Sequence, residues 1–158
     1  MTETLPVMQR EAAALALVKS YVPWAVGAAA IPFPGVDFAT LLAVQQRMLC
    51  KLADHYGLTY RKEAAKSVVA ALLGDVLGST LSGGLVSLAK LAPGIGTLVG
   101  IVSLPAFAGA VTYALGRVFI SHFEAGGTFL DLQPEALRAH FREEFDKAGR
   151  ESGGKAAA

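Results

Sequence analysis

The stretch that decides the fold runs from Ser67 to Gly116 and reads SVVAALLGDVLGSTLSGGLVSLAKLAPGIGTLVGIVSLPAFAGAVTYALG. Only two of its residues, Asp75 and Lys90, are charged, and it holds nine of the chain's 17 glycines. A helix of about 20 apolar residues is long enough to cross the hydrocarbon core of a bilayer. From Leu91 onward the stretch carries no charge at all, so no charged helix face forms there. The stretch is therefore long enough for a helical hairpin that enters the membrane.

The composition of the whole chain agrees with a membrane protein. Charged residues make up 17% of the chain, against about 25% in ordinary soluble domains, and the mean hydropathy is +0.47. The 158 residues suffice for one domain, and the net charge of +1 argues against a nucleic-acid partner. Because Cys50 is the single cysteine, an internal disulfide and a thiolate metal cluster are excluded. The N-terminal residues lack the pattern of a cleaved secretory signal, and we expect the mature chain to begin near Met1.

Proline and glycine positions divide the chain into helices, and no strand pattern is present. The predicted fold class is all-α, with helical hairpins built from long, apolar, glycine-rich helices embedded in a membrane. The helices are expected over these ranges: about Val7 to Ala30, Asp37 to Tyr56 with Gly57 as its cap, from an N-cap at Thr59 into the apolar stretch, Gly96 to Phe123, and Pro134 to Ala148. Residues 1–148 are expected to form a single helical domain, with the apolar hairpin over about 61–124, an amphipathic C-terminal helix over about 134–148 and a flexible tail over 149–158.

Two proline-glycine turns separate the expected helices. The first contains Pro32, Pro34 and Gly35, and the second contains Pro93 and Gly94. The residue before a proline disfavours the helical region, and glycine permits a sharp reversal of the chain. The uncharged run around the first turn is short for a span, so we interpret it as a re-entrant or interfacial wedge. The second turn is expected at the tip of the apolar hairpin.

Basic residues flank the apolar stretch on both sides. Those before it are Arg47, Lys51, Arg61, Lys62 and Lys66, and those after it are Arg117, Arg138, Arg142, Lys147 and Arg150. Short basic segments next to spans stay on the cytoplasmic side. Two segments on one side require an even number of crossings, so the expected location is the cytoplasmic membrane with both basic segments facing the cytoplasm.

Asp75 needs an explanation of its own. A carboxylate within a membrane span is costly and has to face a partner or water, which makes Asp75 a candidate intramembrane polar site. The alternative is that Asp75 marks a part of its helix that does not lie in lipid. The sequence leaves both interpretations open.

Small residues recur at a spacing that suits close helix contact. Gly74 and Gly78 form one GxxxG pattern, and Gly96 and Gly100 form another. In a membrane this pattern favours helix association. The four glycines are therefore candidate helix-packing residues, either between copies of the chain or within one hairpin.

No catalytic constellation is present. The three histidines are dispersed, and none has the spacing to a glutamate that a zinc-binding helix needs. The glycines after Pro93 lack the Lys-Ser or Lys-Thr that a phosphate loop requires. We therefore expect no enzymatic activity, no catalytic residue, no cofactor and no metal.

Several short motifs, taken in order, resemble one bacterial family. They are Ile31-Pro-x-Pro34-x-x-Asp37, Gln45-x-x-Met48-x-x-x-Leu52-Ala53, Tyr56-Gly57, Glu63-Ala64-Ala65, Pro93-Gly94-x-Gly96-Thr97, Thr112-Tyr113-Ala114-Leu115-Gly116-Arg117 and Phe123-Glu124-x-Gly126-Gly127. Together they look like the YcjF-like family, domain of unknown function 697, over about Ala12 to Phe129. The resemblance implies a membrane-associated protein whose relatives are often fused to, or encoded beside, small GTPase domains. Since no GTPase domain is expected in this chain, nucleotide hydrolysis would come from a partner.

The leading hypothesis is a membrane-inserted, self-associating scaffold or membrane-remodelling module. Its expected partners are the lipid bilayer, further copies of the chain and a GTPase. One alternative is a pore or transport component lined by Asp75, Ser79, Thr80 and Ser82. Another is a soluble helical oligomer that buries its apolar surface by self-association.

Overall fold

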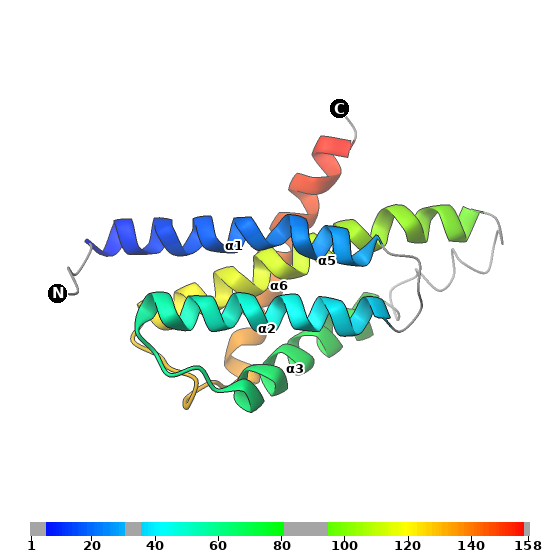
Figure 1. Ribbon diagram of the computed structural model, residues 1–158. Helices are drawn as coiled ribbons and strands as arrows, with labels where there is room; N and C mark the ends of the chain where they lie inside the picture. Colours follow the sequence, from blue (N-terminus) through cyan, green and yellow to red (C-terminus); the bar gives the residue numbers. More distant parts are fainter. Residues whose placement is uncertain (1–5, 31–35, 81–94, 157–158) are drawn as a thin grey trace.

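The computed structural model describes residues 6–30, 36–80 and 95–156, and within these ranges the chain is all-α, as predicted. Figure 1 shows the helices α1 (Val7–Ala29), α2 (Val36–Tyr56), α3 (Lys62–Thr80), α5 (Ile95–Glu124) and α6 (Pro134–Ala156). The predicted turn residues Pro32, Pro34, Gly35, Pro93 and Gly94 lie outside the described ranges.

Local sequence signals place most helix ends correctly. Gly57 follows the last residue of α2 with a φ of 66°, the left-handed conformation that glycine adopts without a steric penalty. The predicted N-cap at Thr59 is wrong, because the first bond of α3 runs from the Ala65 amide to the Arg61 carbonyl. The extended segment before α3 is therefore two residues longer than expected.

The C-terminal helix continues well past its predicted end at Ala148. The structure extends α6 to Ala156, through residues that were expected to form a flexible tail. Ala148 is buried against the bundle, and no proline follows it. Glycine lowers helix propensity by about 1 kcal/mol relative to alanine but does not forbid the helix, so packing at Ala148 outweighs the local signal.

Three helices form the centre of the bundle. Helix α1 runs antiparallel to α5, because Arg10 contacts Glu124 whereas Val26 lies against Gly109. Helix α2 runs parallel to α5, since Gln45 bonds to Thr112 and, eleven residues later, Tyr56 bonds to Glu124. Helix α6 packs on α5 and reaches α3 (Figure 1).

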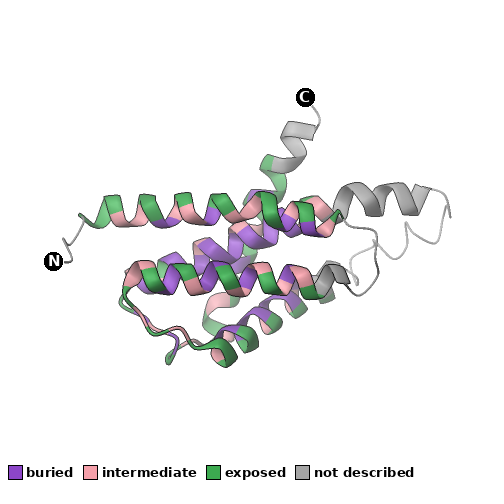
Figure 2. Cartoon of the chain, in the orientation of Figure 1, coloured by how far each residue is buried: buried purple, intermediate pink, exposed green. Residues whose placement is uncertain are grey.

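All five helices contribute to one hydrophobic core. Its largest fully buried side chains include Phe119 of α5, Phe141 of α6 and Met48 of α2. Figure 2 shows that buried positions follow the inward side of each helix and exposed positions the outward side. This one-sided burial is the arrangement of an amphipathic bundle.

The placement of α3 corrects the predicted hairpin. Its apolar side chains Val68, Val69, Leu72, Leu73 and Val76 are buried in the protein core. Within the described residues α3 packs against α6 and α2, whereas α5 packs chiefly against α1 and α6. Within the described residues the two helices therefore do not face each other as the arms of one hairpin, because α3 buries its apolar stripe against α6 and α2.

One of the described helices, α1, is long and apolar enough by length and composition to cross a membrane. Only 22% of its most apolar window is buried inside the bundle. Most of that window therefore remains available for contact outside the protein.

Candidate functional site

The two ends of the bundle differ in polarity, and a polar network closes one of them. Arg10 of α1 donates to both carboxylate oxygens of Glu124, with Nη2 to Oε2 at 2.7 Å and Nε to Oε1 at 3.2 Å. The Tyr56 hydroxyl donates to Glu124 Oε1 at 2.7 Å, and His55 Nε2 lies 2.9 Å from the Arg10 carbonyl oxygen. We call this group of four side chains the charged end.

The electrostatics of the charged end follow from these contacts. The hydrogen bond from Arg10, supported by that from Tyr56, lowers the pKa of Glu124 below its usual value. Burial, followed by the hydrogen bond to Glu124, raises the pKa of Tyr56. At neutral pH Arg10 and Glu124 therefore form an ion pair that is bonded to a neutral phenol, and this arrangement ties three helices together.

Three helices carry no charged residue in the opposite part of the bundle. We define the charge-poor end as Ser20–Ala29 of α1, Phe38–Gln46 of α2 and Pro105–Gly116 of α5, segments without a charged residue. They lie at one level, because Ala25, Leu41 and Ala108 form a buried cluster. Trp24 is 72% exposed there. An exposed tryptophan on a charge-poor surface is typical of a membrane interface.

A pair of buried polar side chains lies inside the bundle at the boundary of this end. The fully buried Gln45 amide donates from Nε2 to Thr112 Oγ1 at 2.8 Å, and Thr112 donates to the Ala108 carbonyl at 2.7 Å. Gln45 Oε1 is buried without a hydrogen-bond partner among the described residues. The bond fixes the register of α2 on α5, because a one-residue slip would leave the buried Gln45 Nε2 without an acceptor.

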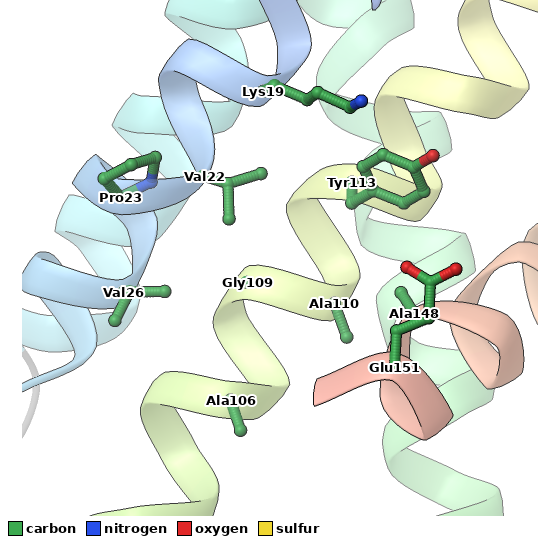
Figure 3. Close-up of a pocket in the computed structure, with 10 residues that line it drawn as sticks. All are labelled: Lys19, Val22, Pro23, Val26, Ala106, Gly109, Ala110, Tyr113, Ala148 and Glu151. Atoms are coloured by element: carbon green, nitrogen blue, oxygen red, sulfur yellow. The ribbon is translucent and has the colours of Figure 1, made fainter. Parts of the chain in front are cut away.

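The closest helix contact is between α1 and α5, and the sequence analysis missed its glycines. A Cβ built at Gly116 would lie 2.4 Å from both Cγ atoms of Val18, and one built at Gly109 would lie 3.0 Å from Val26 Cγ2. In Figure 3, Val22 and Val26 point toward α5 on either side of Gly109. The signal available in the sequence was the valine series at four-residue spacing on α1 facing glycines seven residues apart on α5.

An apolar cleft of about 330 Å³ adjoins this contact, and Figure 3 shows its lining. Helices α1, α5 and α6 contribute its walls, which bear Lys19 and Glu151 as the two charged groups. Nothing in this lining resembles a catalytic arrangement.

The predicted helix-packing glycines take different places. A Cβ built at Gly74 or Gly78 would meet no heavy atom within 4 Å. Close packing within the described chain therefore does not use this GxxxG pair, and its role between copies stays a prediction. Gly96 and Gly100 lie in α5, but their surroundings fall outside the described residues.

Asp75 is paired with α6. Arg142 Nε donates to Asp75 Oδ2 at 2.9 Å, and Arg138 Nε lies 3.9 Å from Oδ1. A second ion pair joins α5 to α6, because Arg117 Nε lies 3.7 Å from Oε2 of the buried Glu144. These contacts attach α6 to the bundle, and they favour the interpretation that the Asp75 level of α3 lies outside the lipid.

No group of three or more metal-ligating side chains is found among the described residues. The arrangement offers a binding surface and a helix-packing surface, and its polar groups are arranged in pairs that stabilise the bundle.

Comparison with known proteins identifies the family. Residues 2–150 match the family described as Domain of unknown function (DUF697), and the chain belongs to it. The chain is also 42% identical over 139 residues to Magnetosome membrane protein 22 of Magnetospirillum gryphiswaldense, a match that covers 87% of this chain and 71% of that protein. No solved structure matches.

Proposed function

We propose that this member of the domain of unknown function 697 family is a membrane-inserted, self-associating helical scaffold. It would enter the bilayer by the charge-poor end and keep the charged end and the charged side of α6 in water, while the apolar side of α6 packs on α5 through Phe145 and Phe107. The observation that carries the proposal is the separation of charge along one bundle, with Arg10 and Glu124 at one end and the exposed Trp24 at the other. Similarity to a magnetosome membrane protein and the apolar helix α1 support association with a membrane.

The orientation in the bilayer can be tested with the single tryptophan of the chain. Expressed protein should resist extraction by a carbonate wash, and brominated acyl chains should quench Trp24 fluorescence. The control is a Trp24→Phe variant that carries Leu130→Trp, because Leu130 is 75% exposed in the loop next to the charged end. Its fluorescence should not be quenched. Release of the protein into the wash would contradict the insertion.

The topology has its own test. Cysteines placed at Arg61 and Arg142 in a Cys50-free variant should both be labelled from the cytoplasmic side. Arg61 directly precedes α3, and Arg142 of α6 contacts Asp75 of α3, so the two positions lie on connected parts of the bundle. Labelling from opposite sides would rule out an even number of crossings.

Self-association is the next part of the proposal. The exposed face of α3 includes the small residues Ser67, Ala70 and Gly74, which would let the backbones of two copies approach closely. Cross-linking in native membranes should yield oligomers. A wedge that displaces one leaflet more than the other is a physical route to membrane curvature, so purified protein should tubulate or cluster liposomes.

A partner GTPase completes the proposal, and the family resemblance is what supports it. The protein would act as its membrane anchor. Affinity purification of the tagged chain from its own host should recover a GTPase whose membrane association depends on this protein.

A further inference from the structure

An open groove of about 1010 Å³ runs along the surface between α1 and α2, away from the cleft in Figure 3. Its lining residues are Ser20, Tyr21, Trp24, Thr40, Ala43, Val44, Gln46, Arg47, Cys50, Lys51, Tyr60 and Lys62. The lining joins aromatic and aliphatic side chains to three cations, which is the combination that an amphiphilic ligand requires.

The positive charge of the groove is poorly compensated. Arg47, Lys51 and Lys62 line it, and none of the lining residues is acidic. Lys51 faces Asp54 at 3.9 Å, but both side chains are more than half exposed, so the pair is weak. No ion pair is found for Arg47 or Lys62 within the described chain. An anion would therefore be attracted to this part of the groove.

The groove also has a direction. Because α1 is antiparallel to α2, Trp24 lies at the level of Val44 in the charge-poor end, whereas Arg47 and Lys51 lie one and two turns toward the charged end. A phospholipid has the same polarity, with acyl chains in the membrane and a phosphate at its surface. Tryptophan and tyrosine side chains such as Trp24 and Tyr21 are enriched at that boundary.

One donor in the groove wall lacks an acceptor. The Tyr60 hydroxyl donates to Gln46 Oε1, but Gln46 Nε2 is buried without a hydrogen-bond partner among the described residues. A buried amide donor without an acceptor is costly. A phosphate oxygen bound beside Arg47 would supply one after a small rotation of the Gln46 side chain.

We propose that the groove between α1 and α2 binds the headgroup of an anionic phospholipid, with Arg47, Lys51 and Lys62 around the phosphate and Trp24 beside the acyl chains. The inference rests on the proposed membrane insertion and adds the lipid class that the protein recognises. It assigns to these cations a role in selecting the lipid, which insertion by the charge-poor end alone does not require.

Cys50 and Trp24 are the only cysteine and tryptophan of the chain, and both line the groove. The test uses detergent-solubilised full-length protein, to which phosphatidylglycerol or phosphatidylcholine is added. Phosphatidylglycerol should slow the alkylation of Cys50 by an uncharged maleimide, and shift Trp24 emission to the blue, at lower concentrations than phosphatidylcholine. Each rate is compared with the rate of the same variant without lipid, which removes the effect of the cations on thiol reactivity.

Removal of the groove cations should abolish the preference. For Arg47→Gln alone, and for the variant that adds Lys51→Gln and Lys62→Gln, the apparent affinity for phosphatidylglycerol should fall by about fivefold per cation removed. All three side chains are exposed, so we expect the variants to fold, and the single variant suffices if the triple one does not. Arg47→Lys, which keeps the charge, should retain the preference. The matched control replaces Lys19, Lys66 and Arg150 with Gln, a loss of three exposed cations outside the groove, and should behave like the wild type.

Four results would overturn the inference. They are equal protection of Cys50 by both lipids, an equal loss of affinity in the control variant, full protection by inorganic phosphate alone, and protection that depends on protein concentration instead of lipid. The last would assign the groove to a second copy of the chain. Failure of the insertion proposal is separate, because it appears as carbonate extraction and leaves lipid binding in detergent measurable.

Discussion

Helices α3 and α5 come from the same apolar, glycine-rich stretch, but the bundle uses them in different ways. Helix α5 lies at the centre and is buried over most of its described length, with glycines pressed against valines of α1. Helix α3 buries one face and exposes another that carries small residues. The number of glycines in a helix therefore does not say where close packing occurs. A glycine is required where the facing side chain is branched and cannot move.

The largest loss of folding stability is expected from a substitution at the contact between α1 and α5. In Gly116→Ala the new methyl would lie 2.4 Å from Val18, whose own side chain is fully buried. Overpacking costs about 1–3 kcal/mol, and a contact this short against a fully buried side chain belongs at the upper end of that range, so the net loss after a gain of about 1 kcal/mol in helix propensity is about 2 kcal/mol. Chemical unfolding in detergent should show the loss.

Two controls accompany this substitution. Gly27→Ala places a methyl in open space on α1 and should not destabilise the protein. Val18→Ala should partly rescue Gly116→Ala, because it removes both clashing methyl groups. Wild-type stability of Gly116→Ala would mean that α1 and α5 do not approach as closely as described.

A smaller loss of folding stability is expected at the charged end, where side chains of α1 and α2 bond to Glu124 of α5. Glu124→Gln removes the ion pair with Arg10 and weakens the acceptor for Tyr56. Hydrogen bonds to charged groups contribute about 1.5–3 kcal/mol, but the glutamine amide still accepts a hydrogen bond and the Arg10 side chain is one third exposed, so the free energy of unfolding should fall by about 1 kcal/mol at neutral pH.

The pH dependence of the same network follows from its pKa. Because the pKa of Glu124 is lowered in the folded protein, its contribution is fully present above the ordinary value of 4.5 and is lost as the pH falls through the folded pKa. Wild-type stability should therefore fall below pH 4.5 more steeply than that of Glu124→Gln. Parallel profiles for the two proteins would show that Glu124 is not paired.

A substitution of Asp75 in α3 should lower the folding stability by less than either of these changes. This carboxylate is partly exposed and paired with Arg142, an arrangement that contributes about 0.2–1 kcal/mol in comparable pairs. Asp75→Asn should lose no more than this, and combining it with Arg142→Gln should add little. Membrane binding should be retained, and wild-type protein in sealed liposomes should pass no ions. A conductance that disappears in Asp75→Asn would support the pore instead of the scaffold.

Local chemistry explains which features could be predicted from the sequence. Helix ends depend on neighbouring residues, so Gly57 and the proline at the start of α6 were sufficient signals. Pairing between helices depends on residues far apart in the chain. Arg10, Tyr56 and Glu124 are separated by dozens of positions, and no local pattern connects them.

The partners of the candidate site residues could not be predicted either, because they also lie far away in the sequence. The sequence indicates that Asp75 would need a partner or water if it lay within a span, but Arg142 could not be chosen among the basic residues without knowledge that α6 packs against α3. The GxxxG motif at Gly74 and Gly78 marked a helix able to pack closely. It did not mark Gly109 and Gly116, because their spacing becomes meaningful only against the valines of α1.

The smallest effect on stability, and the most direct test of the comparison, is expected at Gly74. A methyl group added there meets open space, so Gly74→Ala should raise the free energy of unfolding of the monomer by up to about 1 kcal/mol through helix propensity alone. This is the opposite sign to Gly116→Ala, although both substitutions add one methyl to a glycine of the same apolar stretch. Gly74→Leu separates the two roles of the position. Because leucine also has a high helix propensity, it should raise the stability of the monomer by a similar amount, but it should reduce cross-linked oligomers in membranes, because a bulky side chain keeps the backbones of two copies apart. Destabilisation by Gly74→Ala would show that another helix lies against this face of α3, whereas undiminished oligomers in Gly74→Leu would assign self-association to a different surface.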